Sequence, residues 1–184
     1  MKKLLALAVV AMVAAVAPAC GSDGDDGAAP DDTTTTRSPA EAVAGIIPVP
    51  TRPTCQLLTR QEVAEVLGNP VQQGSGVERD CFWGTEVDGG TSANLAVAKF
   101  VPGQAGAECE LQRSVLPKDL PHESVRGLGT FAVWLPEQVA ILTQGRLLAC
   151  WDDAVVNVNL SGERPQQELR GVAVTLAEKA RARI

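Results

Sequence analysis

The sequence predicts an α+β fold, an antiparallel β-sheet with helices packed on it, in a disulfide-bonded domain. Three observations lead to this prediction. Short apolar runs separated by turn residues fill much of the second half of the chain, as the strands of an antiparallel sheet do. Three other segments carry apolar residues at helical spacing. Four cysteines lie in or beside these elements, so bridges between helices and strands are expected.

The first predicted helix starts at Thr59, because Thr59 and Glu62 have the spacing of a capping box, in which hydroxyl and carboxylate satisfy free backbone donors reciprocally. Gly68 supplies its stop. A second helix is predicted within residues 104–116, which lie between two prolines. The segment Arg164–Ile184 predicts an amphipathic helix from the periodic residues Leu169, Val172, Ala173, Leu176 and Ala180.

The strands are predicted from the apolar runs between these helices. Asp80–Trp83 and Leu95–Phe100, joined through a Gly-rich turn, predict a hairpin. Further short strands are expected at Thr130–Leu135, Val139–Thr143, Leu147–Trp151 and Val155–Leu160, with turns at Pro136-Glu137, Gly145-Arg146 and Asp152-Asp153. The last strand predicts one dry and one polar face, because Val156, Val158 and Leu160 alternate with Asn157, Asn159 and Ser161.

The N-terminus has the layout of a signal peptide over residues 1–19. Two lysines precede the apolar run Leu4–Val16, which spans only about 20 Å as a helix and is too short to cross a bilayer stably. Small residues then lead to Cys20, an arrangement that resembles the bacterial lipobox. That resemblance implies cleavage before Cys20, lipidation of its thiol and acylation of the freed amine, with palmitate expected. The alternative is an ordinary secretory signal with an unmodified Cys20.

Residues 20–52 are rich in Gly, Asp, Pro, Ala and Thr and predict a disordered tether, which leaves residues 53–184 as a single domain. The formal net charge of the chain is -6, and about half of the mature chain's net negative charge lies in this tether. No basic or aromatic cluster resembles a nucleic-acid surface, so nucleic acid is not an expected partner. The expected partners are the membrane, through the lipid anchor, and an unidentified envelope protein or ligand.

Four cysteines remain after Cys20, and in an exported chain two disulfides are the default prediction. Three pairings are possible. We favour Cys55 with Cys81 and Cys109 with Cys150, because each pair joins a helical segment to a strand. A zinc site built from the four thiolates is the alternative, but no C-x-x-C pair supports it. No metal or cofactor is therefore predicted.

His122, the only histidine, is the one candidate for a general base, with Glu123 or Asp119 as its carboxylate. No nucleophile motif accompanies it, so an exposed loop histidine is the favoured interpretation. Asp152-Asp153 could bind calcium, but an Asp pair between strands is ordinary turn chemistry. A calcium site would draw on Asn157 or Asn159 as well. No residue is predicted to be catalytic.

The three tryptophans are Trp83, Trp134 and Trp151. Each lies in an apolar strand run, so a place in the core is favoured over the wall of a ligand groove.

Three motifs together resemble a family of actinobacterial secreted lipoproteins whose role is not characterised. They are Cys55-Gln56-Leu57-Leu58-Thr59 leading to Leu67-Gly68, then Cys81-Phe82-Trp83, then Gly127-Leu128-Gly129 with Phe131 and Trp134. The family pattern is C-x-L-L-T…L-G, C-x-W and G-L-G-x-x-A-x-W, and the match covers most of residues 55–180. The resemblance implies a secreted, disulfide-bonded α+β domain behind a lipobox and a low-complexity linker. It implies no activity.

The expected function is a non-catalytic binding or interaction module, lipid-anchored on the outer face of the plasma membrane. Two alternatives stay open. One is a carrier of lipid or another apolar ligand, and the other is an envelope hydrolase that uses His122.

Overall fold

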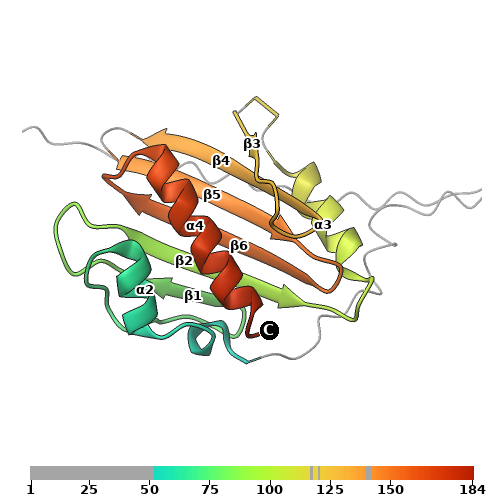
Figure 1. Ribbon diagram of the computed structural model, residues 1–184, viewed down its shortest axis with the longest axis horizontal. Helices are drawn as coiled ribbons and strands as arrows, with labels where there is room; N and C mark the ends of the chain where they lie inside the picture. The colour runs from blue at the N-terminus through green and yellow to red at the C-terminus, as the bar shows by residue number, and fades with distance from the viewer. Residues whose placement is uncertain (1–51, 117, 120, 140–141) are drawn as a thin grey trace, which may run out of the picture. The chain divides into compact units, whose positions relative to one another are not determined.

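The computed structural model describes residues 52–116, 118–119, 121–139 and 142–184, and within them it confirms the predicted α+β fold. Six strands form one antiparallel sheet in the order β1-β2-β6-β5-β4-β3, against which three α-helices pack (Figure 1). The elements are the 3₁₀ turn η1 (Thr54–Gln56), α2 (Arg60–Leu67), β1 (Asp80–Trp83), β2 (Ser92–Lys99), α3 (Ala105–Ser114), β3 (Glu123–Ser124), β4 (Phe131–Val139), β5 (Leu142–Cys150), β6 (Ala154–Gly162) and α4 (Gln166–Arg181).

Helix α2 begins and ends where the sequence predicts. The backbone N–H of Glu62 donates to the hydroxyl of Thr59 at 3.2 Å, and the backbone N–H of Thr59 donates to the carboxylate of Glu62 at 2.9 Å. Both halves of the capping box are therefore present. Gly68 closes the helix with φ +64°, a left-handed conformation that glycine adopts at little cost.

The turns predicted at Pro136-Glu137 and Gly145-Arg146 are wrong. Both pairs lie inside two nine-residue strands, β4 and β5, where Pro136 is the register partner of Gly145. Pro136 lies beyond the two residues of β4 that β3 pairs with, so its missing N–H breaks no bond on that edge. Gly145 makes room for the indole of Trp134, since a Cβ at this position would lie 1.9 Å from Cζ2 of the ring.

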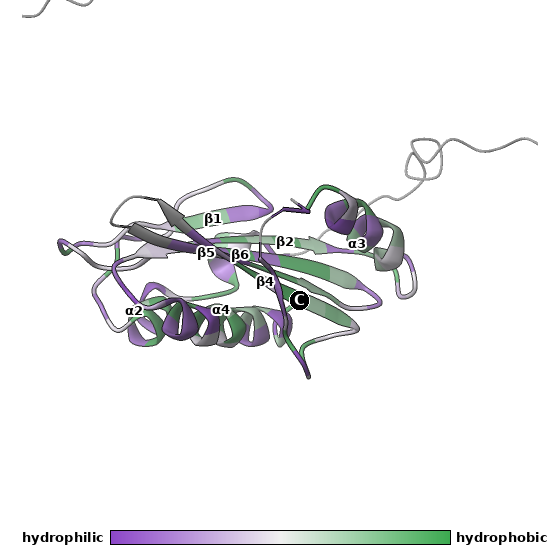
Figure 2. Ribbon diagram, turned by 90° about the horizontal axis from the view of Figure 1, so that it is seen from above, coloured by the Kyte–Doolittle hydropathy of each residue, from purple (hydrophilic) through white to green (hydrophobic). Residues whose placement is uncertain are grey.

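Two hydrophobic clusters cover opposite faces of the sheet. The larger cluster lies under α4 and α2 and receives alternate strand residues such as Leu147, Val156 and Val158. The smaller cluster lies under α3 and receives strand residues that point to the other face of the sheet, such as Leu148 and Val155. Figure 2 shows the same division, with α2 and α4 on one side of the sheet and α3 on the other side, at one end. Because successive side chains of a strand point to opposite faces, each central strand contributes residues to both clusters.

The two disulfides have the pairing favoured from the sequence. Cys55 in η1 is bonded to Cys81 in β1, with Cα atoms 5.0 Å apart. Cys109 in α3 is bonded to Cys150 in β5, with Cα atoms 6.0 Å apart. Each bridge fastens a helical segment to the sheet, and the two lie in different clusters. The zinc alternative is excluded for these thiols, because all four are oxidised in pairs.

The predicted signal peptide, Cys20 and the tether up to residue 51 lie outside the described residues. Among the residues described, no helix combines the length and the apolar character needed to cross a bilayer.

Candidate binding surface

His122 lies at an exposed position immediately before the two-residue strand β3. Its neighbour Glu123 is in β3 and faces α4, where its carboxylate lies 3.8 Å from Nε of Arg170. Asp119 is exposed in the segment before it. The structure thus places all three residues of the hydrolase hypothesis in exposed chain near β3, and it commits Glu123 to an ion pair.

Asp152 and Asp153 form the turn between β5 and β6, as the favoured interpretation predicts. The carbonyl oxygen of Asp152 accepts hydrogen bonds from the backbone N–H groups of Gly103 and Ala105. The Asp153 carboxylate forms an ion pair with Arg181 of α4, at 2.7 Å. Within the described ranges, no cluster of acidic, histidine or cysteine side chains could hold a metal ion.

Two of the tryptophans are core residues, as predicted. Trp83 and Trp134 are each 1% exposed and belong to the larger cluster. Trp151 is only partly buried and packs at the margin of that cluster, with the guanidinium of Arg181 5.5 Å from its ring centroid.

The sheet face opposite α4 carries a row of one aromatic and three polar side chains, which α3 contacts only at Arg146. Phe82, Asn94, Asn159 and Arg146 are successive register partners across β1, β2, β6 and β5. Partners in an antiparallel sheet point to the same side, and here their chain neighbours Cys81, Ala93, Leu160 and Leu147 are buried on the α4 side. Together with Asn157, which bonds to Arg146, these residues form what we call the polar face.

The polar face is accessible as well as polar. Asn159 is exposed, Phe82 is 47% exposed, and Asn94, Arg146 and Asn157 are half-buried. A side-chain N–H of Asn159 donates to the amide oxygen of Asn94 at 3.2 Å. These contacts hold the row of amides in place while leaving part of their hydrogen-bonding capacity for a ligand.

Arg146 lies at the α3 end of the row and is the only charged residue of the polar face. Its Nε and Nη2 donate to the amide oxygen of Asn157, at 3.3 and 3.1 Å, and Nη2 also donates to Gln112 of α3 at 3.2 Å. All of these acceptors are neutral. None of the ion pairs formed within the described part of the chain includes Arg146. A half-buried cation with only amide partners is suited to binding an anionic group.

Two hollows lie elsewhere on the domain. A shallow one of about 520 Å³ follows α2 and the turn after it, between Arg60 and Asn69. Asn69 is committed there to structural bonds, donating to the carbonyl of Thr91 at 3.2 Å and accepting from its N–H at 2.9 Å. A smaller hollow of about 300 Å³ lies beside the start of α4 and is lined in part by Trp134 and Arg170. Neither hollow contains any residue of the polar face.

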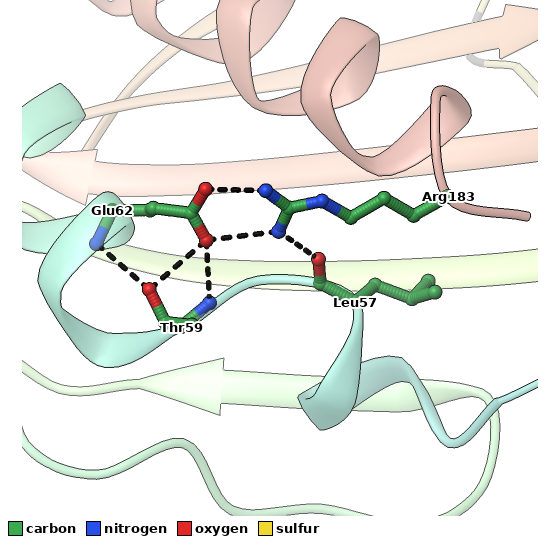
Figure 3. A network of polar contacts seen from close by, with 4 residues as sticks. All are labelled: Leu57, Thr59, Glu62 and Arg183. Carbon is green, nitrogen blue, oxygen red and sulfur yellow. Dashed lines mark hydrogen bonds and ion pairs between the residues drawn. The ribbon is translucent and has the colours of Figure 1, made fainter.

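A cluster of polar contacts joins the C-terminus to the start of α2 (Figure 3). Arg183 donates to both carboxylate oxygens of Glu62 and to the carbonyl of Leu57. The bonds from Arg183 and from the backbone of Thr59 lower the pKa of Glu62 well below its ordinary value. Because every member of the cluster is satisfied by another, its role is structural.

Sequence reasoning found part of this surface. The alternation along β6 predicts a polar side that contains Asn157 and Asn159. It missed Arg146, because Gly145-Arg146 resembles a turn, and it missed Asn94 and Phe82. Only the register across four strands brings these residues into one row.

Comparisons with known proteins add little to this geometry. No family model matches the chain, and no curated protein matches it. Among solved structures, the chain is similar to the crystal structure of the extracellular domain of PknH from Mycobacterium tuberculosis. The identity is 16% over 71% of this chain and 75% of that chain, with a TM-score of 0.40. What the domain binds must therefore be inferred from its own residues.

Proposed function

We propose that this chain is an exported lipoprotein that acts as a non-catalytic binding module at the cell envelope, with the polar face as its binding surface. The observation that carries the proposal is the accessible row of amides that ends at Arg146, a cation with no acidic partner in the described residues. A surface that is exposed, preorganised and incompletely hydrogen-bonded is suited to capture a polar ligand.

Export is supported by the two disulfides, because such bonds form and persist in oxidising compartments. The lipid anchor is proposed from Cys20 and the leader before it. Acyl chains on Cys20 would hold the domain at the outer face of the plasma membrane, at a distance set by the tether. We also propose that the chain belongs to the actinobacterial lipoprotein family, on the basis of the three motifs that begin at Cys55, Cys81 and Gly127.

A capture experiment tests the binding role. The full chain is immobilised and exposed to envelope extracts, in parallel with Asn159→Ala on the polar face and Lys179→Gln on α4, which covers the opposite face of the sheet. We expect the wild type and Lys179→Gln to retain the same material and Asn159→Ala to retain several-fold less. Equal capture by all three proteins would contradict the proposed surface.

The two alternatives predict different results. A hydrolase should show turnover in a broad substrate screen that His122→Ala abolishes, and that result would overturn the non-catalytic assignment. A carrier should retain lipid when purified without detergent after removal of its anchor, which mass spectrometry would detect. We expect neither turnover nor retained lipid.

A further inference from the structure

We propose that the polar face binds a saccharide that carries a carboxylate, and that Arg146 is the residue that recognises this charge. This inference rests on the proposed function and narrows the ligand of the same surface to one chemical class.

The bonding of Arg146 leaves room for an anion. Within the part of the chain that the structure describes, its bonds use Nε and Nη2 only, so the donors of Nη1 are left for a ligand. Gln112 accepts from Arg146 and in turn donates to Glu108 at 2.9 Å, so the nearest carboxylate in this chain of bonds is separated from the guanidinium by an amide. A ligand carboxylate would give Arg146 an ion pair, which its neutral amide neighbours cannot provide.

The amides beside Arg146 suit hydroxyl groups. Each amide has two N–H donors and an oxygen that accepts twice, and the bond between Asn159 and Asn94 uses only part of this capacity. Sugar hydroxyls both donate and accept, so neighbouring hydroxyls of one ring can bond to one amide through both of its ends. The two amides occupy adjacent strands in direct register, which places them in line with Arg146.

Phe82 supplies an apolar surface at the other end of the row. It is 47% exposed, and its register partner is Asn94. The C–H groups on one face of a pyranose ring pack well against an aromatic ring, whereas a free inorganic anion gains nothing from it. With strands about 4.8 Å apart, the row from Phe82 to Arg146 spans about 14 Å, which is long enough for a short oligosaccharide.

The edges of the polar face disfavour a polyanion. Asp80 lies two residues before Phe82 on β1, and Glu137 lies two residues after Leu135, the register partner of Arg146 on β4. Residues two apart on a strand point to the same side, so both carboxylates flank the row. A chain with a phosphate at every unit would meet them, whereas a single carboxylate among neutral hydroxyls meets only Arg146.

The test compares two probes that differ only in charge. The full chain is titrated calorimetrically with a tetrasaccharide that carries one glucuronate among neutral sugars and with its methyl ester, in which that carboxylate is neutral. We expect the acid to bind at least about tenfold more tightly than the ester, since an ion pair with a half-buried arginine exceeds a bond to an uncharged ester oxygen by about that factor. Raising the salt concentration should reduce this preference.

Variants locate the interaction. Arg146→Gln should remove the preference for the charged probe, and Phe82→Ala should weaken both probes equally. The matched control Lys179→Gln removes one positive charge from α4, on the opposite side of the sheet, and should bind as the wild type does. Thermal unfolding of each variant confirms that it is folded. If Arg146→Gln does not fold, Phe82→Ala provides an independent test of the surface.

The outcomes separate this inference from the function on which it rests. Equal affinity for the two probes, or no binding of either, would overturn the acidic saccharide. Capture of envelope material that depends on Asn159 would still support a binding surface in that case. If, in addition, Asn159→Ala captured as much envelope material as the wild type, both proposals would be overturned.

Discussion

Glu62 couples the start of α2 to the C-terminal residues through Arg183. The Arg183 bond, with the bonds from Thr59, holds the pKa of this carboxyl below its value in an unfolded chain. A group with a depressed folded pKa stabilises the fold fully above its unfolded pKa of about 4.3 and loses that contribution as the pH falls below it. The stabilisation by Glu62 should therefore be present at pH 7 and decline in the acid range.

Urea unfolding of the wild type and Glu62→Gln at several pH values measures this. The wild type should have the larger free energy of unfolding at pH 7, and the difference in this free energy between the two proteins should decrease as the pH falls below about 4.3. Glu110→Gln is the control, because Glu110 forms only an exposed pair with Arg113. A gap between wild type and Glu62→Gln that is the same at pH 7 and pH 3 would contradict the coupling.

Gly145 lies in strand β5 and Gly171 lies in helix α4. The space around the first glycine is filled, whereas the space around the second is open. A Cβ at Gly145 would lie 1.9 Å from the Trp134 ring, whereas a Cβ at Gly171 in α4 meets nothing within 4 Å. We expect Gly145→Ala to lower the free energy of unfolding by about 1–3 kcal/mol through overpacking. Gly171→Ala should raise it by roughly 0.5–1 kcal/mol through helix propensity. Chemical denaturation measures the free energy of unfolding of both variants. A Gly145→Ala protein more stable than the wild type would contradict the close packing of Trp134 against Gly145.

At the scale of elements, we expect each disulfide to stabilise the domain by restricting the unfolded chain. They close loops with sequence separations of 26 and 41 residues. In the chain-entropy model, each such bridge stabilises the fold by about 3–4 kcal/mol. The variant Cys55→Ala/Cys81→Ala should lose about that amount in denaturant unfolding, and thiol counting on the denatured wild type should find none of the four cysteines free. Two or more free thiols would refute this prediction.

We expect helix α3 to depend on its bridge more than α4 depends on any single contact. Its buried residues are Ala105 and Cys109, whereas five residues of α4 are buried. In Cys109→Ala/Cys150→Ala, the α3 amides should therefore exchange with solvent much faster relative to the wild type, while the α4 amides change less. Hydrogen exchange read by NMR or mass spectrometry resolves the two helices. Equal acceleration in both would mean that α3 does not open independently.

At the scale of the whole molecule, the proposed anchor determines where the polar face is displayed. If Cys20 is lipidated, Cys20→Ala should move the protein from the membrane fraction into the medium or leave it uncleaved. Fractionation followed by mass spectrometry of the N-terminal peptide measures this. Recovery of soluble, unmodified mature protein from wild-type cells would contradict the anchor.

The sequence by itself determined the elements whose cause is local. The capping box at Thr59, the stop at Gly68, the amphipathic pattern of α4 and the alternation of β6 all act over a few residues, and the structure has each of them. The favoured disulfide pairing is confirmed, but the sequence had left it open, because helix-to-strand bridges also allow Cys55 with Cys150 and Cys81 with Cys109; the fold, which brings Cys55 to Cys81 and Cys109 to Cys150, decided it.

Only the tertiary structure decided the long strands β4 and β5 and the polar face. Pro136 and Gly145 have the local preferences of a turn, yet a sheet edge tolerates the proline and the Trp134 ring occupies the space beside the glycine. Arg146 gained its neighbours in the same way, through register across strands that are far apart in sequence. Strand register depends on packing of the whole sheet, so no local pattern in the chain specifies which side chains share its polar face.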